Sequence, residues 1–369
     1  MLKEFERIYR NRFEEARKKD KPVVGWICTQ VPEEIIYAAN ALPFRVLGTM
    51  EFGPEVDPYL EICVCPFVRS YISLAVRKEY DFLDGLVVGH TCDITRRSYD
   101  LWGYVTKTPF TYFINTPHTY GSEEANKFYL KEIKLFKEGL ESFFGRHISD
   151  KSLRQAIEVY NKNRDLLKKT YELRREHPPL ISGIEALEIV ISSMSIPKDE
   201  HNKLLCQLLK EVPDREVPKG PRIFVSGSIV DHTNLIELIE ECGGNVVCDD
   251  LCTGARYFWN LVEPNADPLG AIAKRYMNKI PCGFMIPPDG QYVLEDKHDF
   301  VMGMVKKYDV NGVIINTHKY CDPYMFEAPI LTEKLQERDI PSLSLEHDHT
   351  RGGIEHLRTR VEAFIEMLR

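Results

Sequence analysis

Short apolar runs alternate with amphipathic stretches along most of this chain, a pattern typical of proteins built from alternating strands and helices. Residues 22–28 (PVVGWIC) predict a buried strand, residues 32–41 a helix that begins at a proline, and residues 43–48 (PFRVLG) a second strand. The same order of strand, helix and strand recurs over residues 221–250. The pattern therefore predicts one βαβ unit near each end of the chain.

A second internal repeat relates residues 77–93 (RKEYDFLDGLVVGHTCD) to residues 305–322 (VKKYDVNGVIINTHKYCD). Both segments contain a helix end, a turn, an apolar strand and a final Cys-Asp pair, so Cys92 and Cys321 are expected at equivalent strand ends. A helix-forming stretch and a strand that begins with proline follow each of them. These repeats predict an α/β protein with two related doubly wound parallel sheets of the Rossmann or flavodoxin-like kind.

The sequence pattern also predicts where the domains of the chain begin and end. Residues 123–211 are largely helical with charged faces, and residues 211–221 (EVPDREVPKGP) contain three prolines without an apolar period, which favours a linker. We therefore expect an N-terminal α/β domain over residues 1–122, a mainly helical segment over 123–215 and a C-terminal α/β domain over 216–369. Ligands of open parallel sheets gather at the carboxyl ends of the strands, which points to a site between the two domains.

The net charge of the chain limits the classes of partner that it is expected to bind. The chain has 369 residues with 48 Lys and Arg against 56 Asp and Glu, so its formal charge is −8, which argues against nucleic acid and anionic membranes. The first twenty residues are charged throughout, and no later stretch has the roughly 18 apolar residues of a membrane span. These features predict a cytoplasmic protein whose partners are small molecules or other proteins.

Ten cysteines are numerous for such a protein. A reducing compartment argues against disulfides, which leaves metal ligands, reactive thiols or buried packing residues. Cys206 and Cys242 lie at apolar positions of predicted helices and are expected to be packing residues. Six others stand at predicted strand ends or in irregular segments and could converge on one crevice: Cys28, Cys65, Cys92, Cys252, Cys282 and Cys321.

The spacing of these thiols favours iron–sulfur chemistry over zinc. Zinc sites usually contain close Cys pairs, and this chain has no CxxC motif. Iron–sulfur clusters accept thiolates brought together from distant loops, so a cluster held between the domains fits best. The chain also has neither a P-loop nor a dinucleotide-binding glycine motif, so any ATP-driven step requires a partner.

Several other polar residues are candidates for proton transfer or for contacts with a cluster. Glu346 and Asp348 lie in the loop at the end of the last predicted strand, are expected to face the crevice, and are proton-donor candidates. His90 and His318 precede Cys92 and Cys321 and either hydrogen-bond cluster sulfur or are structural. The HDH sequence at residues 347–349 permits a metal site, although a polar strand end explains it better.

Five segments together resemble the superfamily of 2-hydroxyacyl-CoA dehydratases and benzoyl-CoA reductases: GWICTQVPEEIIYAAN, CPFVRSYISLA, GHTCDITRR, INTHKYCDP and LEHDHTRGGIEHLRTRVEAF. The resemblance covers nearly the whole chain in the same order. It implies that Cys65, Cys92 and Cys321 match three cysteines that bind one 4Fe-4S cluster. Three further matches, at Cys28, Cys252 and Cys282, resemble the branch with a double-cubane 8Fe-9S cluster. Cys63 and Cys248 are additional to this pattern and neighbour the matched ligands.

The resemblance implies a homodimeric reductase component that receives low-potential electrons from a separate ATP-hydrolysing iron–sulfur activator and reduces small molecules. Glu346, Asp348 or a nearby histidine would then supply protons. Two alternatives remain open. One is a subunit of a 2-hydroxyacyl-CoA dehydratase or benzoyl-CoA reductase with a single 4Fe-4S cluster, and the other is a non-catalytic electron carrier.

Overall fold

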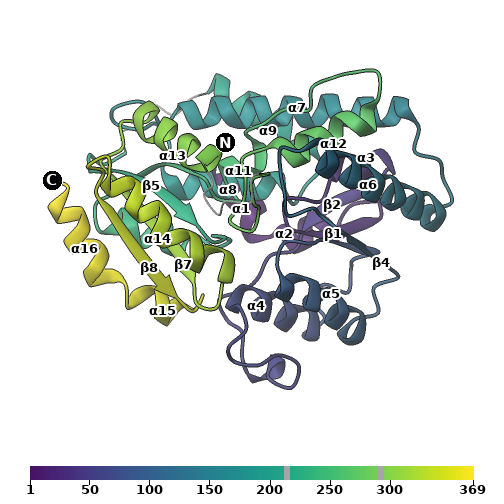
Figure 1. Cartoon of the computed structure of the whole chain (residues 1–369), viewed down its shortest axis with the longest axis horizontal. Coiled ribbons are helices and arrows are strands. Elements are labelled where there is room, and N and C mark those ends of the chain that lie inside the picture. Colours follow the sequence, from purple (N-terminus) through teal and green to yellow (C-terminus); the bar gives the residue numbers. More distant parts are fainter. Residues whose placement is uncertain (212–216, 289–294) are drawn as a thin grey trace.

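The computed structural model describes residues 1–211, 217–288 and 295–369, and this part of the chain contains two parallel four-stranded sheets (Figure 1). The first sheet has the order β2-β1-β3-β4, with β1 Val23–Ile27, β2 Leu42–Arg45, β3 Gly85–Gly89 and β4 Phe110–Ile114. The second repeats it as β6-β5-β7-β8, with β5 Arg222–Gly227, β6 Asn245–Asp249, β7 Gly312–His318 and β8 Ser342–His347. The predicted pair of doubly wound sheets is confirmed.

Helices cover both faces of the first sheet, which explains why β1 and β3 are apolar along their whole length. Val24 and Trp26 of β1 point to one core and Val23 and Ile27 to the other. Figure 1 shows the two helical layers. One layer has α4 Pro66–Val76 and α5 Asp93–Val105, and the other has α3 Glu33–Ala38, α6 Glu123–Phe144 and α12 Pro268–Asn278.

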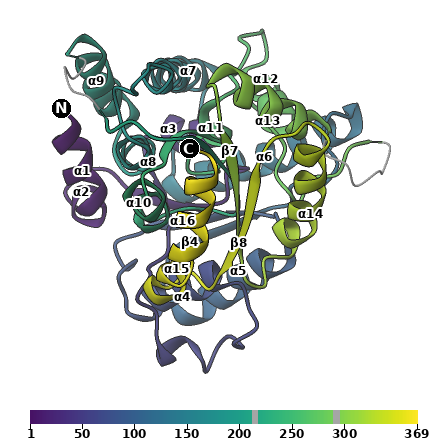
Figure 2. The same ribbon diagram turned by 90° about the vertical axis from the view of Figure 1, so that its left-hand side faces the viewer.

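The second sheet is covered in the same way, with α14 and α16 on opposite sides of β7 and β8 (Figure 2). Ile223 and Val225 of β5 pack on one side, whereas Phe224 between them packs on the other. The helices of one side are α10 Asn234–Glu241, α15 Arg351–Glu355 and α16 Arg358–Met367. Those of the other side are α13 Glu295–Lys307 and α14 Asp322–Gln336.

The residues between the sheets are mainly helical, as predicted, and their long helices share one core with β1. Ser122 and Ser149 begin two of these helices, because each side chain accepts a hydrogen bond from a backbone N–H of the first turn. Besides α6, the segment contains α7 Asp150–Glu172, α8 Gly183–Ser193 and α9 Lys198–Lys210. Residues 212–216 of the predicted linker lie outside the described residues.

Shorter helices complete the described structure. Two of them precede β1, one follows β2 and one follows β6: α1 Leu2–Arg10, α2 Arg12–Arg17, the 3-10 helix η1 Pro54–Val56 and α11 Ala255–Phe258. In the described residues, no helix has the length and apolar character that crossing a bilayer requires.

A buried ion pair joins three of the long helices. Glu34 of α3 is fully buried and forms an ion pair with Arg164 of α7, and Tyr276 of α12 donates a hydrogen bond of 2.8 Å to the other carboxylate oxygen. Burial alone would raise the pKa of Glu34, but Arg164 and Arg275 hold it below its ordinary value. The carboxylate is therefore ionised in the folded protein and connects the helices around it.

In each sheet the first strand in sequence lies between the second and the third strand, so successive strands are added first on one side of it and then on the other. The chain leaves β1 toward β2 on one side and β3 on the other, and β5 diverges likewise toward β6 and β7. Such switch points leave a crevice at the carboxyl ends of the strands. Residues that directly follow β1, β3, β5 and β7 line a common cavity, so the two crevices face each other.

Candidate functional site

A cavity of about 110 Å³ lies where the two switch points meet. All six cysteines selected from the sequence line it: Cys28, Cys65, Cys92, Cys252, Cys282 and Cys321. Most of the other lining side chains are apolar, including Phe67, Ile94 and Phe284. The fold thus brings six thiols from loops up to more than 290 positions apart in sequence into one largely apolar space.

The other four cysteines do not line this cavity. Cys206 and Cys242 are half-buried and pack against the cores, as expected. Cys248 is fully buried within β6, and Cys63 is exposed. Position along the chain therefore separates the cavity thiols from the rest.

Three of the six cysteines immediately precede a helix. Cys65, Cys92 and Cys321 occupy the position before the first turn of α4, α5 and α14, respectively. A helix N-terminus carries partial positive charge and unpaired N–H groups, which favour a thiolate over a thiol. These positions suit sulfur that must be negatively charged.

The six thiols form two groups of three. The first trio consists of the three cysteines that each precede a helix. Contact with Cys65 and burial raise the pKa of Cys321, and burial, with the neighbouring Cys321 and Cys28, raises the pKa of Cys92. We call Cys65, Cys92 and Cys321 the helix trio. In the second, the pKa of Cys252 is raised to about 11, chiefly by burial, and the neighbouring Cys282 and Cys28 contribute to the rise. We call Cys28, Cys252 and Cys282 the loop trio.

Cations and hydrogen-bond donors surround the loop trio. Arg256 Nη1 lies 3.6 Å from Cys282 Sγ, and the Tyr324 hydroxyl lies 3.2 Å from the same sulfur. Burial raises the pKa of Cys28, whereas Arg45 and Lys279 lower it. Around the helix trio, Thr95 Oγ1 lies 3.1 Å from Cys92 Sγ. Both trios therefore have groups that stabilise anionic sulfur.

Arg45 is the most unusual cation at the cavity. Its side chain is 2% exposed and stacks over Trp26, with 4.5 Å between the guanidinium carbon and the ring centroid. Within the described part of the chain, its Nε and Nη1 atoms have no hydrogen-bond partner. A buried guanidinium with free donors is costly, so this position favours a negatively charged occupant of the cavity.

The chemistry of these donors fits an iron–sulfur cluster. Soft thiolate ligands select zinc, copper(I) or iron–sulfur centres, and six of them exceed the four ligands of a zinc site. Without metal, burial keeps the pKa of Cys28, Cys92 and Cys252 above the ordinary value, so the thiols would stay protonated. Iron would supply the positive charge that lets them ionise.

The predicted proton-transfer residues fall into two groups. His318 is fully buried and lines the cavity, and burial holds its pKa well below the ordinary value. The His90 ring contacts the His118 ring at a tilt, with 4.8 Å between ring centroids, and His118 lines an adjoining cavity of about 260 Å³. The helix trio cysteines line that adjoining cavity as well.

The structure places the two carboxylates elsewhere. Glu346 is exposed on β8 and does not line the cysteine cavity. Asp348 accepts hydrogen bonds from the backbone N–H and hydroxyl of Thr350, at 3.2 and 2.7 Å. Their proposed role as proton donors stays a prediction.

Sequence reasoning did not select Arg45, Arg256 or Tyr324, although all three contact or line the thiol site. For Arg45 a signal was present, because an arginine inside the apolar run PFRVLG is out of place on a buried strand. Arg256 and Tyr324 had no comparable signal. Both lie in helices whose packing the sequence pattern does not reveal.

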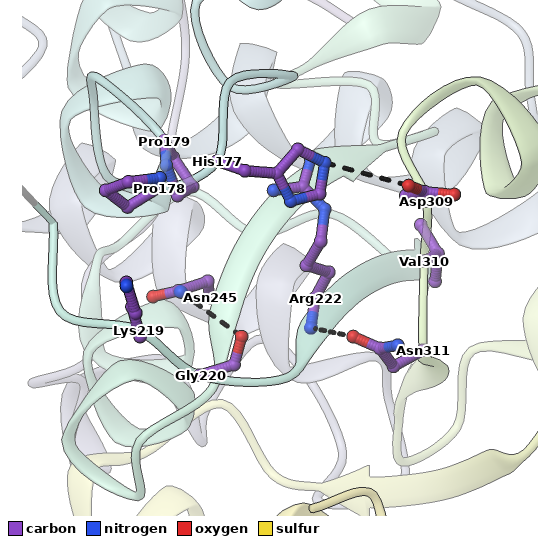
Figure 3. A pocket seen from close by; sticks show the side chains of 10 residues that line it. All are labelled: His177, Pro178, Pro179, Lys219, Gly220, Arg222, Asn245, Asp309, Val310 and Asn311. Atoms are coloured by element: carbon purple, nitrogen blue, oxygen red, sulfur yellow. Dashed lines mark hydrogen bonds and ion pairs between the residues drawn. The ribbon is translucent and has the colours of Figure 1, made fainter.

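A larger cleft of about 620 Å³ lies at the opposite, amino-terminal edge of the second sheet (Figure 3). His177 lies 3.7 Å from Asp309, and the Arg222 guanidinium donates hydrogen bonds to the carbonyls of Arg174 and Tyr308, so these side chains already have partners within the protein. Ligands of parallel sheets bind at the other edge. This cleft therefore lacks the properties that single out the thiol-lined cavity.

Fold and cavity define a two-sheet α/β protein with a thiol-lined site between the sheets. The chain belongs to the family of the 2-hydroxyglutaryl-CoA dehydratase D-component, whose sequence profile matches residues 28–368. The resemblance to the dehydratase and reductase superfamily is thus confirmed.

Three characterised relatives are similar over almost their whole length. One subunit of the benzoyl-CoA reductase from Thauera aromatica is 28% identical over 95% of this chain and 91% of that protein. The beta subunit of (R)-phenyllactyl-CoA dehydratase from Clostridium sporogenes is 26% identical over 94% of this chain and 91% of that subunit. The beta subunit of (R)-2-hydroxyglutaryl-CoA dehydratase from Acidaminococcus fermentans is 24% identical over 100% of this chain and 99% of that subunit.

Proposed function

We propose that this protein is an iron–sulfur oxidoreductase, the reductase component of a two-component system, and that it carries a double-cubane 8Fe-9S cluster. The observation that carries the proposal is the convergence of six cysteines on one cavity. A single 4Fe-4S cluster leaves the loop trio without a role. Two joined clusters account for both trios.

The residues around the cavity would hold the cluster and tune it. The helix trio and the loop trio would supply the six thiolates, and when bound the cluster would supply low-potential electrons. Arg45 and Arg256 would offset its negative charge, Tyr324 and Thr95 would donate hydrogen bonds to sulfur, and apolar walls would exclude water. His318 and His90 would hold or transfer protons, with Glu346 and Asp348 as further donors.

The remaining features of the proposal concern partners and organisation. The chain has no P-loop, and its relatives are named as subunits, so a separate ATP-hydrolysing iron–sulfur activator would deliver the electrons. The adjoining cavity beside the helix trio would admit a small reducible substrate. We further propose a homodimer located in the cytoplasm, with the domains divided at residues 122 and 215.

Iron and acid-labile sulfide per chain test the proposal on anaerobically purified protein. We expect about eight irons and slightly more sulfide. About four irons, together with saturable binding of an acyl-CoA, would overturn it in favour of a single-cluster dehydratase or reductase subunit. Eight irons with reversible redox cycling, but no turnover of any small oxidant in the presence of the activator, would leave an electron carrier.

Replacing Arg45 by methionine is expected to make the cluster harder to reduce. The substitution removes a buried positive charge from the cavity wall, so we expect the reduction potential to fall by tens of millivolts. A redox titration followed by electron paramagnetic resonance measures the shift. Arg45→Lys keeps the charge and should stay near the wild-type potential; an equal shift in both variants would contradict an electrostatic role.

A further inference from the structure

A second group of metal-ligating side chains lies outside the thiol-lined cavity. Asp231 and His232 follow β5, and His349 follows β8. Asp231 Oδ1 lies 3.0 Å from His232 Nδ1 and 3.3 Å from His349 Nε2. One ligand atom from each residue lies within 4.8 Å of the other two, so a single ion could contact all three.

The charge balance of this group is incomplete. Asp231 is fully buried, and the ionic partners found for it in the described structure are the two histidines, with no lysine or arginine among them. A buried carboxylate without a lysine or arginine partner is costly, so the position favours a cation beside it.

The surroundings orient these side chains. The Gly48 N–H donates a 2.8 Å hydrogen bond to Asp231 Oδ2, which leaves Oδ1 directed at the two imidazoles. His349 has a positive φ of 61°, a backbone conformation that side-chain-bearing residues seldom adopt. Its Nε2 atom lies 3.3 Å from Asp231 Oδ1 without forming a hydrogen bond, and it is buried with no other hydrogen-bond partner in the described structure. Such strain persists where the surrounding structure requires it.

We propose that Asp231, His232 and His349 bind one divalent transition-metal ion. Two imidazoles and a carboxylate are the ligands of many zinc and non-haem iron(II) sites, and they differ from the thiols of the cavity. A divalent cation supplies the missing countercharge. The hydrogen-bonded second oxygen of Asp231 is the kind of support that carboxylate ligands usually have.

The ion connects two loops at the edge of the thiol-lined cavity. The His349 ring contacts the His318 ring edge to face, with 4.9 Å between ring centroids, and His318 lines the cavity. Metal binding by His349 therefore restrains the loops after β5 and β8 and the ring of His318 beside Cys321. The ion would have a structural role, because it holds these two loops together next to the proposed cluster. Its binding does not depend on the cluster.

Zinc is the probe that tests this site in iron-loaded, anaerobically purified protein. After dialysis against a chelator and equilibration with Zn²⁺, we expect about one tightly bound zinc per chain, measured by inductively coupled plasma mass spectrometry. X-ray absorption at the zinc edge should show only nitrogen and oxygen ligands at about 2.0–2.1 Å. His232→Gln and His349→Gln should each weaken zinc binding at least tenfold.

His298→Gln is the matched control, because His298 is also buried and neither of its ring nitrogens has a partner in the described structure. It should bind zinc as the wild type does. The proposal is overturned if the wild type retains no zinc, if both variants bind it normally, or if sulfur ligands appear at about 2.3 Å. Zinc on nitrogen and oxygen in a protein with only four irons would uphold this site and refute the double cubane.

Discussion

Joint replacement of Cys252 and Cys282 by serine should remove at least half of the iron, from about eight to about four or fewer per chain. A serine hydroxyl has nearly the shape of a thiol but does not ionise at neutral pH, so it cannot replace a thiolate ligand. Both cysteines belong to the loop trio and line the cavity. Iron and sulfide assays on anaerobically purified protein measure the loss.

The same double variant should lose reduction of small substrates in the presence of the activator. Cys63→Ser and Cys206→Ser are matched controls, since the first thiol is exposed and the second packs against the core, and neither lines the cavity. Both should keep the wild-type iron content. Full iron in the double variant, or an equal loss in the controls, would contradict the assignment of the loop trio.

Arg164→Met should destabilise the protein by about 3–5 kcal/mol, the usual cost of removing one partner of a buried ion pair. Glu34 is fully buried, so its carboxylate would lose its ion-pair partner and keep the hydrogen bond from Tyr276 and the more distant charge of Arg275. The urea midpoint, followed by circular dichroism, measures the change. Lys274→Met removes an exposed partner of Glu263 and should cost less than about 1 kcal/mol.

The pH dependence of this loss has a defined sign. The pKa of Glu34 is held below its ordinary value of 4.5 in the folded protein, so the ion pair contributes fully above that pH. Its contribution is lost as pH falls through the folded pKa. The stability difference between wild type and Arg164→Met should therefore be largest near pH 7 and shrink below pH 4.5. A difference that is constant across this range would exclude an ionic origin.

Local patterns are sufficient to predict the repeated sheet architecture. Strands buried on both faces are apolar throughout, and GLVVG and GVIIN therefore identify β3 and β7. Because each is followed by Cys-Asp and a helix, the repeat also places Cys92 and Cys321 at equivalent helix N-termini. Strand limits are less accurate, since the pattern predicts the second strand over residues 43–48, whereas β2 spans Leu42–Arg45.

The sequence by itself determined the fold class and the six thiols of the cavity, because strand burial and position at strand ends are properties of neighbouring residues. Only the tertiary structure decided which distant polar groups meet. It placed Arg45 and Arg256 beside the thiols, exposed Glu346, and brought His349 to Asp231 across more than 100 positions. Such contacts depend on how the two sheets face each other, and the local pattern of apolar and polar residues does not predict that arrangement.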